Sequence, residues 1–390
     1  MKHAKKSLGQ YFTTDESLQN AVKGFILNDP IRILEPSIGR GDLVASILQK
    51  RPTQQFVMIE IDETIDVLPA VNRSVIRYEN FLLTIFEEKE TFKTIVGNPP
   101  FVRTKTGNLY IDFIKKSFLL LESGGELIFI VPSDFFKTTS ASKVIIDMMI
   151  HGTFTHIYHP HNEHLFQGAS IDVLAFRYCK DAALPHETFY NGVKMQLQHN
   201  NGLVTFHKEK EKEKEKEKAF LMNDVFQICV GLVSGKEEVY KNAILGNLDV
   251  LNGENKVEKY IFAETFPTET QEINNYLLEH KPILLQRAIR KFTEKNWFEW
   301  GAPRNIHKIR DHMGKPCIYI CTLTRQPKVA FLSTVQYFGA GLLMLLPKNN
   351  ISANELKETV NRLNSDAFRQ NFTFSGRFKI GQRQLCNCQI

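Results

Sequence analysis

The 390-residue sequence contains no long apolar run, which excludes several classes of protein. No stretch of about 18 apolar residues occurs, so no transmembrane helix is expected. The N-terminal residues 1–6 contain three lysines and lack the apolar core of a signal peptide. Hydrophobic residues make up 43% of the chain and charged residues 24%, as in an ordinary soluble globular protein. We therefore expect a cytoplasmic protein, whose length suggests two domains.

Closely spaced cysteines are also nearly absent, which argues against the usual zinc sites. The six cysteines include two close pairs, Cys317/Cys321 and Cys386/Cys388. Neither pair has the two-residue gap of a zinc knuckle, and no second half-site follows at zinc spacing. We expect reduced structural thiols in a cytosol-like compartment.

Acidic residues become rare toward the C-terminus. Residues 281–390 contain 18 Lys and Arg but only 6 Asp and Glu, whereas the whole chain has a net charge of only +6. The first 280 residues are therefore net acidic. A C-terminal third this basic predicts contact with a polyanion, and nucleic acid is the commonest choice. A merely solubilising surface is the alternative.

What the first 180 residues do contain is an alternation of short β-branched runs with amphipathic segments. The expected strands are residues 31–34, 56–59, 75–78, 94–96, 127–131, 155–158 and 173–178, and the expected helices are residues 15–27, 43–49, 62–70, 109–121 and 140–150. Such alternation predicts an α/β fold with a mostly parallel, doubly wound sheet. In such sheets ligands bind at the carboxyl ends of the strands.

A strict Lys-Glu alternation from Lys208 to Lys218 separates this half from the next. On a helix its i,i+3 pairs would be opposite in charge and its i,i+4 pairs alike, so helical support is mixed. We predict a linker or extended surface loop at residues 206–219, between domains at residues 1–205 and 220–390. The pattern after Phe220 is irregular and predicts no topology.

Carboxylates and glycines follow the first two expected strands. Glu35 precedes a turn that contains Gly39 and Gly41, and glycines there let a ligand approach the backbone closely. Glu60 ends the second strand, where a carboxylate can bind a ribose cis-diol. The turn lacks the third glycine of a dinucleotide site, and Glu35 would repel a pyrophosphate but suit a cationic ligand. S-adenosylmethionine, a positively charged nucleoside, fits this pattern better than NAD.

The most distinctive stretch is Ile-Val-Gly-Asn-Pro-Pro-Phe at residues 95–101. Pro99 and Pro100 fix φ and remove two backbone donors, so the turn is stiff and its carbonyls stay free to accept hydrogen bonds. Asn98 adds a side-chain carbonyl, and Phe101 adds a flat face. Together these residues are suited to grip an exocyclic amino group and to stack on the ring that carries it.

These stretches occur in an order that resembles a known family. Residues 7–14 (Ser-Leu-Gly-Gln-Tyr-Phe-Thr-Thr), 34–41, 59–62 and 97–101 resemble the ordered motifs of the gamma class of DNA adenine-N6 methyltransferases, usually partners of type II restriction enzymes. The resemblance covers about residues 7–180. Weaker resemblances to that class's target-recognition domain occur at residues 231–235, 297–301 and 375–378.

The resemblance implies a Rossmann-like methyltransferase sheet in a catalytic domain, followed by a mixed α+β target-recognition domain. It also implies S-adenosylmethionine as cofactor and S-adenosylhomocysteine as product. Thr13 would contact the methionine end, and Ile61 would pack on the adenine. The amino-acid pocket would be shaped by Glu35, Ser37, Gly39 and Gly41, and the ribose hydroxyls would be bound by Glu60. Asn80 stands where the family usually has Asp, and its amide oxygen would still accept from the adenine amino group, with less charge assistance.

For catalysis the resemblance implies Asn98, Pro99, Pro100 and Phe101. An adenine amino group is a poor nucleophile because its lone pair is delocalised into the ring. Hydrogen bonds to the Asn98 side-chain oxygen and the Pro99 carbonyl would direct that lone pair toward the methyl donor. The target base must be flipped out of the duplex, with Phe101 stacking on it. Phe166 matches the aromatic residue that holds the base from the other side, although a Phe there more often belongs to the core.

The expected partner is double-stranded DNA, bound by a monomer. Candidate contacts are Arg304, Arg325, Arg377, Lys379 and Arg383, each of which suits a phosphate contact or a surface charge better than base reading. No nuclease core is found, so the cognate restriction endonuclease would be a separate chain. Four histidines lie between His156 and His164. The transfer needs no metal, so we expect them in a loop or strand end near the catalytic cleft.

Three other interpretations remain open. Ribosomal RNA adenine-N6 dimethyltransferases also begin with a Gly-Gln motif, but they have Asn-Leu-Pro-Tyr/Phe at the catalytic turn and a much smaller C-terminal domain. Protein glutamine methyltransferases use Asn-Pro-Pro-Tyr and have no reason for a large basic C-terminal domain. The third is a catalytically inactive DNA-binding module, against which the intact turn from Asn98 to Phe101 argues.

Overall fold

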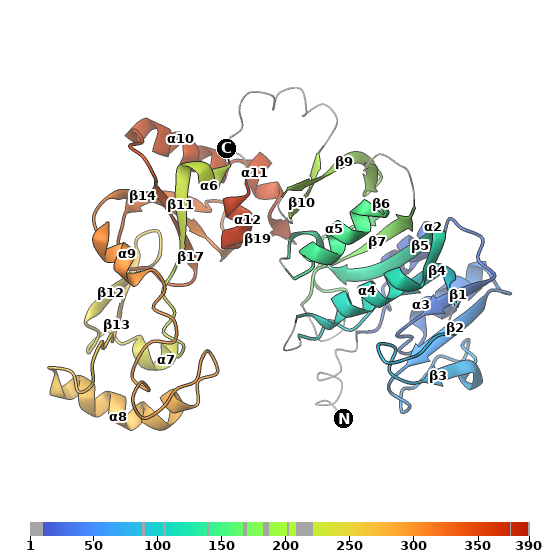
Figure 1. Cartoon of the computed structure of the whole chain (residues 1–390), viewed down its shortest axis with the longest axis horizontal. Helices are drawn as coiled ribbons and strands as arrows, with labels where there is room; N and C mark the ends of the chain where they lie inside the picture. Colours follow the sequence, from blue (N-terminus) through green and yellow to red (C-terminus); the bar gives the residue numbers. More distant parts are fainter. Residues whose placement is uncertain are drawn as a thin grey trace. The chain divides into compact units, whose positions relative to one another are not determined.

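The computed structural model describes residues 11–87, 90–103, 107–138, 140–166, 170–181, 187–200, 203–207, 221–374 and 376–388. The chain divides into two units, residues 1–217 and 218–390. They are blue to green and yellow to red in Figure 1. The predicted linker, from residue 208 onward, lies outside the described residues, as do residues 7–10 of the N-terminal motif.

Unit 1 is built on a mixed ten-stranded sheet with the order β10-β9-β8-β6-β7-β5-β4-β1-β2-β3 (Figure 1). Its strands are β1 (Arg32–Glu35), β2 (Gln55–Glu60), β3 (Ile76–Tyr78), β4 (Phe92–Gly97), β5 (Leu121–Pro132), β6 (Gly152–Tyr158), β7 (Val173–Lys180), β8 (Glu187–Tyr190), β9 (Val193–Asn200) and β10 (Leu203–His207). Five neighbouring strands run parallel to one another, in the order β5, β4, β1, β2 and β3. By contrast, β7 runs antiparallel to both of its neighbours.

The sheet is thus less parallel than predicted, because the predicted strand β7 reverses direction and because the sequence interpretation missed β8, β9 and β10, of which β9 is antiparallel to both neighbours. β8 and β9 form an antiparallel hairpin around Asn191 and Gly192, which both have positive φ. An Asn-Gly pair between two apolar runs is a strong signal for such a turn. The Asn191-Gly192 pair is thus a sequence signal for this hairpin.

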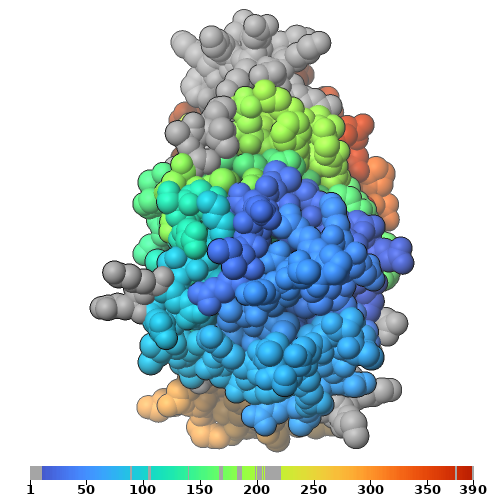
Figure 2. Space-filling model, turned by 90° about the vertical axis from the view of Figure 1, so that its right-hand side faces the viewer, coloured from blue at the N-terminus to red at the C-terminus, as the bar shows by residue number. Residues whose placement is uncertain are grey.

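Helices cover both faces of the sheet. They are α2 (Glu16–Phe25), α3 (Asp42–Lys50), α4 (Leu109–Leu120) and α5 (Ser142–Ile150), with short 3-10 turns at Arg73–Val75 and Phe135–Lys137. Successive β5 residues point to opposite faces: Ile128 packs in the core under α2 and α3, and Phe129 in the core under α4 and α5. The surface seen in Figure 2 is formed mainly by the blue and light-blue first hundred residues.

Residues 62–70, predicted as a short helix, instead form a chain of turns. The Asp62 carboxylate accepts the Thr64 N–H at 3.0 Å, which closes a local turn in place of a helical one. The Leu68 N–H then donates to the carbonyl of Arg40, and Pro69 ends the segment. Backbone groups are therefore satisfied by the neighbouring glycine turn and not by a helix.

Unit 2 has mixed α+β content, as predicted. Its strands are β11 (Phe226–Val230), β12 (Leu248–Gly253), β13 (Lys256–Tyr260), β14 (Pro316–Cys321), β15 (Leu323–Thr324), β16 (Ala330–Thr334), β17 (Leu342–Pro347), β18 (Thr373–Phe374) and β19 (Arg377–Lys379). Its helices are α6 (Met222–Val225), α7 (Glu237–Tyr240), α8 (Gln271–Leu285), α9 (Ile306–Asp311), α10 (Ala353–Asn364), α11 (Asp366–Gln370) and α12 (Gln382–Cys386).

The centre of unit 2 is the antiparallel sheet β11-β17-β14-β16. In β17, Leu343 and Leu345 face the core beneath α10, whereas Leu342 and Met344 face a second core that holds Trp297. Both faces of this strand are therefore buried. Within the described residues, no helix of either unit is long and apolar enough to cross a membrane.

Candidate functional site

Four polar side chains follow neighbouring strands of unit 1 at one edge of the sheet. Strands β4, β1, β2 and β3 are adjacent and parallel, so their carboxyl ends meet there. Asn98 follows β4, Glu35 ends β1, Glu60 ends β2 and Asn80 lies two residues beyond β3. Neighbouring strands are about 4.8 Å apart, so the four residues form a row across the sheet edge.

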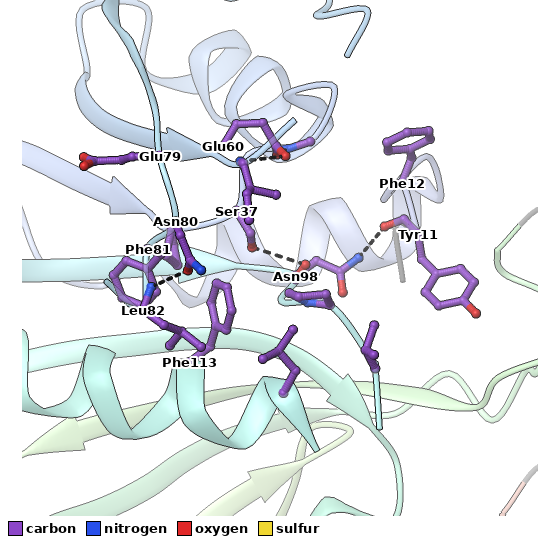
Figure 3. Close-up of a pocket in the computed structure, with 16 residues that line it drawn as sticks. Tyr11, Phe12, Ser37, Glu60, Glu79, Asn80, Phe81, Leu82, Asn98 and Phe113 are labelled. Atoms are coloured by element: carbon purple, nitrogen blue, oxygen red, sulfur yellow. Dashed lines mark hydrogen bonds between the residues drawn. The ribbon is translucent and has the colours of Figure 1, made fainter. Parts of the chain in front are cut away.

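A pocket lies above this row (Figure 3). Its empty volume, which includes space open to solvent, is about 860 Å³. The predicted site residues that line it are Ser37, Gly39, Glu60, Ile61, Asn80, Asn98 and Pro100. Lining residues that the sequence interpretation gave no role include Tyr11, Phe12, Glu79, Phe81, Leu82 and Phe113. Tyr11 and Phe12 belong to the N-terminal motif, which was the available signal for them.

Glu60 organises the glycine turn as well as lining the pocket. Its carboxylate accepts backbone N–H groups from Gly39 at 2.8 Å, Ile61 at 3.0 Å and Asp62 at 2.9 Å. Burial raises the pKa of this carboxyl, although the three hydrogen bonds oppose that shift. Ile61, beside it, is 55% exposed and presents an apolar face to the pocket.

Glu35 lies beneath the pocket and not on its lining. It is 1% exposed, and it accepts the Ser37 N–H at 3.1 Å. Burial raises the pKa of the Glu35 carboxyl to about 8, and the nearby charge of Glu60 adds to the shift. A Cβ atom on Gly97 would lie 3.0 Å from the Glu35 oxygen, so this strand end is closely packed against the acid. A positive charge bound nearby would favour ionisation of Glu35.

The two glycines of the turn have different tasks. Both have positive φ, +56° at Gly39 and +87° at Gly41. Gly39 lines the pocket and gives its N–H to Glu60. Gly41 begins helix α3 away from the lining, and a Cβ there would lie only 2.6 Å from a methyl group of Val71. Gly41 is thus needed for the turn itself.

The side-chain amide of Asn98 is held in one orientation. Its Nδ2 donates to the backbone oxygen of Tyr11 at 2.8 Å (Figure 3). It also donates to the hydroxyl of Thr13 at 3.0 Å. A flipped amide would place its oxygen against the Tyr11 carbonyl. The Oδ1 atom of Asn98 is buried, and it has no hydrogen-bond partner in the part of the chain that the structure describes. A buried acceptor left without a donor costs about 1–3 kcal/mol, and such an atom calls for a functional explanation.

Three aromatic rings meet beside Asn98. Phe101 and Phe166, predicted as the two sides of a base pocket, lie 6.3 Å apart between ring centroids at 73°. The Tyr11 ring packs on both, at 5.9 Å from Phe101 and 5.7 Å from Phe166. Phe166 is only 3% exposed and also belongs to the apolar core under α2 and α3. The remaining proline of the turn, Pro99, is buried behind it.

The histidine cluster lies at the base of the β6–β7 connection that carries Phe166. His159 is buried and contacts Asp172 through Nε2 at 2.8 Å and the Tyr190 hydroxyl through Nδ1 at 2.7 Å. The contact with Asp172 joins the two ends of the connection, and the contact with Tyr190 ties it to β8. Among the described residues, no group of three or more His, Cys, Asp or Glu side chains is arranged to hold a metal ion.

The five basic residues predicted to contact DNA all lie in unit 2, but the structure does not bring all of them together. Arg325 directly follows β15, Arg377 and Lys379 are on β19, which pairs with β15, and Arg383 is on α12 immediately after. Arg304 precedes α9 in another part of the unit and is exposed.

The tryptophans of the segment 297–301 are buried structural residues. Trp297 and Trp300 are 3% and 2% exposed, and the Trp300 indole donates to the carbonyl of Ile261 at 2.8 Å. Neither side chain is available for contact with a ligand.

Comparisons of the sequence with known proteins find methyltransferases. Residues 47–166, which include the Asn98 turn and Phe166, match the family described as Eco57I restriction-modification methylase. The type II methyltransferase M.HincII of Haemophilus influenzae is 32% identical over 203 residues, which are 46% of this chain and 39% of that protein. Ribosomal RNA small subunit methyltransferase A of Helicobacter pylori (strain G27) is 40% identical over 63 residues, 16% of this chain and 22% of that protein. The chain therefore covers about two fifths or less of the length of these relatives.

Among solved structures, the chain is similar to the type IIL restriction-modification enzyme MmeI in complex with DNA. The TM-score is 0.59 at 10% sequence identity, and the similarity covers 96% of this chain and 64% of that one. The predicted Rossmann-like methyltransferase fold is confirmed.

Proposed function

We propose that this chain is a DNA methyltransferase that transfers a methyl group from S-adenosylmethionine to N6 of a flipped-out adenine in duplex DNA. It would serve as the modification half of a restriction-modification system, as a monomer beside a separate endonuclease. The observation that carries the proposal is the buried, unpartnered Oδ1 of Asn98 at the edge of the pocket. An acceptor fixed in that way suits an exocyclic amino group.

The residues of the pocket fit the cofactor in charge and order. Glu60 offers its remaining acceptor capacity to ribose hydroxyls, and the Glu35 carboxyl below is suited to a positively charged ligand. The strands follow one another in the order β4, β1, β2 and β3, and Asn98 lies at the β4 end of this row. The reacting end of the cofactor would therefore lie near β4, and its base near β3. When bound, the cofactor supplies an electrophilic methyl group on a sulfonium. Ser37 and Gly39, between these ends, would hold the amino-acid portion.

The chain's part in the chemistry is to position the amino group. One N–H of the adenine N6 donates to Asn98 Oδ1 and the other to the Pro99 carbonyl, which turns the nitrogen lone pair toward the methyl carbon. With the cofactor bound, the N–C bond would form as the S–C bond breaks, and one N6 proton would leave to solvent. Alignment and fixed dipoles supply the acceleration, so no covalent nucleophile is needed. The flipped base would stack on Phe101. Phe166, which is 3% exposed and covered by the Tyr11 ring, would reach the other face of the base after that ring moves.

DNA binding is assigned to the basic residues of unit 2. Arg325, Arg377, Lys379 and Arg383 lie on connected elements, β15, β19 and α12, as a phosphate-binding group requires. Arg304 would make a separate contact. The net basic charge of residues 281–390 supports a polyanionic partner. The similarity to MmeI, whose structure is a DNA complex, supports the same assignment.

The test is methyl transfer from radiolabelled S-adenosylmethionine to duplex DNA, RNA and protein offered separately. We expect label on N6 of adenine in DNA, loss of most label for Asn98→Ala, and normal transfer by Asn72→Ala, an exposed Asn of the same unit outside the pocket. Cofactor and DNA binding should persist in Asn98→Ala. Labelled RNA with unlabelled DNA would favour the second candidate, an RNA adenine methyltransferase, which the short H. pylori similarity suggests. Labelled protein alone would refute both.

A further inference from the structure

The base end of the pocket presents a hydrogen-bond donor. Asn80 lines this end, and its Oδ1 accepts the backbone N–H of Leu82 at 3.0 Å. In Figure 3 the dashed line to Leu82 leaves from the red oxygen of Asn80, and the blue nitrogen lies on the other side of the amide. No protein acceptor for this Nδ2 is found within the described part of the chain. The side chain thus turns its NH₂ group, and not its oxygen, away from the backbone.

This orientation of the Asn80 amide is fixed by the chain. A flip would set the NH₂ group against the Leu82 N–H, two donors facing each other. The turn that supplies this N–H is itself held, because the N–H groups of Leu83 and Thr84 donate to the Asn80 carbonyl at 2.9 Å. The Lys116 ammonium also donates to the carbonyls of Phe81 and Thr84. Rotating the amide would cost the Leu82 hydrogen bond with no replacement.

The strand order decides which part of the ligand meets Asn80. This step rests on the proposed function. The reacting end lies beside Asn98 on β4 and the ribose at Glu60 on β2, so the base extends past Glu60 toward β3. There Phe81, Leu82 and Phe113 give the pocket an apolar lining, which suits the ring of a base. The polar side chains at this end are Asn80 and the more exposed Glu79.

We propose that Asn80 donates a hydrogen bond to the edge of the cofactor's base, so that the pocket does not select for a 6-amino group. A 6-oxo purine accepts from Nδ2 directly, whereas a 6-amino group there meets another donor. Adenine would then be bound through its ring faces and through the ribose, and not through its amino group. A carboxylate at position 80 would behave differently, because one oxygen takes the Leu82 N–H and the other accepts from a 6-amino group.

The experiment compares S-adenosylhomocysteine with S-inosylhomocysteine, its 6-oxo analogue, by calorimetric titration into the full chain. For the wild type we expect dissociation constants within about threefold of each other. In Asn80→Asp the adenosyl compound should be favoured by about tenfold or more, because a charge-assisted hydrogen bond is gained and the 6-oxo group meets a carboxylate. Glu87→Gln, at an exposed glutamate of the same unit that does not line the pocket, is the control and should leave the wild-type ratio unchanged.

The possible failures are distinguishable. If the wild type itself favours the adenosyl compound by tenfold or more, Asn80 accepts and this inference is overturned, while the cofactor assignment stands. A Glu79→Gln variant that abolishes such a preference would identify Glu79 as the acceptor, with the same consequence. If a folded wild-type chain binds neither compound, the proposed cofactor class fails and this inference fails with it. The wild-type ratio decides the question even if Asn80→Asp does not fold.

Discussion

The amide nitrogen of Asn98 lies 3.0 Å from the hydroxyl oxygen of Thr13, a residue 85 positions earlier in the chain. Thr13 is 4% exposed and does not line the pocket. The resemblance to gamma-class enzymes implied that Thr13 contacts the methionine end of the cofactor. From the hydrogen bond to Asn98 we infer a second role for Thr13, which is to hold the Asn98 amide so that Oδ1 stays free to accept a hydrogen bond.

Replacing Thr13 with Val separates these two roles. Val keeps the size but removes the acceptor for Asn98 Nδ2, so the amide is held by the Tyr11 carbonyl alone. We expect kcat to fall about tenfold, the cost of one hydrogen bond of about 1–1.5 kcal/mol, with an unchanged dissociation constant for the cofactor. Thr13→Ser should restore most of the rate. A raised dissociation constant with normal kcat would instead support the cofactor contact.

Phe101 offers a second test, directed at the target base. Base–aromatic stacking is worth about 1–3 kcal/mol per base, so Phe101→Ala should lower kcat/KM for duplex DNA by about 10- to 100-fold. Phe101→Tyr keeps the ring and should stay within a few-fold of the wild type. A 2-aminopurine at the target position would report flipping independently of turnover. Equal activity of the Ala and Tyr variants would remove Phe101 from the base pocket.

The raised pKa of Glu35 predicts that the free energy of unfolding depends on pH. Its pKa is about 8 in the folded chain, against an ordinary value of 4.5. Between these values the folded state binds more protons than the unfolded state, so the free energy of unfolding falls as pH rises through this window. Glu35→Gln should flatten this part of the profile in urea titrations. The matched control is Glu16→Gln, at an exposed glutamate on α2.

The same group should link cofactor binding to pH. Because a cationic ligand favours ionised Glu35, affinity for S-adenosylmethionine should rise from about pH 6 to pH 8 and then level off. Titrations in buffers of different ionisation enthalpy would detect the proton released on binding. If the wild type and Glu35→Gln show the same pH profile, the cofactor does not sense this carboxyl.

DNA binding should depend on salt through the basic residues near β19. Removing one side chain that binds a phosphate lowers the slope of log K against log salt by about 0.9. The double substitution Arg377→Gln with Lys379→Gln should therefore lower the slope by about 1.8, and Arg304→Gln by about 0.9. Lys50→Gln, an exposed lysine at the end of α3, serves as the control. If the variants have the same slope as Lys50→Gln, these basic side chains do not bind DNA phosphates.

The sequence predicted the parallel half of the unit 1 sheet because each of its strands is a short apolar run that ends in a polar residue or a turn. It also placed Asn98, Glu60 and Asn80 at or just past the ends of expected strands, where ligands bind in such sheets. Strand β17 was missed for a physical reason. Leu342–Pro347 is apolar at nearly every position because both of its faces are buried, so it lacks the alternation that identifies a strand.

The finer features of the site depend on contacts between distant residues. No local pattern shows that Thr13 and the Tyr11 carbonyl take both hydrogens of the Asn98 amide. The orientation of Asn80 is also hidden, because it depends on the Leu82 N–H meeting the amide oxygen in the folded turn. Sequence motifs identify which groups gather at the pocket, whereas hydrogen bonds of the fold decide which atom each group presents.

A buried ion pair between Glu126 and Arg177 gives the last prediction, which concerns stability. The Arg177 Nε lies 2.7 Å from Glu126, and Arg177 and Glu126 are 6% and 0% exposed. Glu126 also accepts the Thr94 hydroxyl at 2.9 Å and the Asn28 N–H at 3.1 Å, so it connects β4, β5 and the residues after α2. Glu126→Ala should cost about 3–5 kcal/mol in urea unfolding, because it leaves a buried guanidinium without its partner.

The double substitution Glu126→Leu with Arg177→Met should cost clearly less than the sum of the two single substitutions. Removing both charges leaves neither ion desolvated without a partner. Lys115→Ala breaks an exposed pair with Asp112 on α4 and should cost under about 1 kcal/mol. Additive effects of the single substitutions would mean that the pair is not energetically coupled. Cofactor affinity should be unchanged in the double variant, because neither side chain lines the pocket.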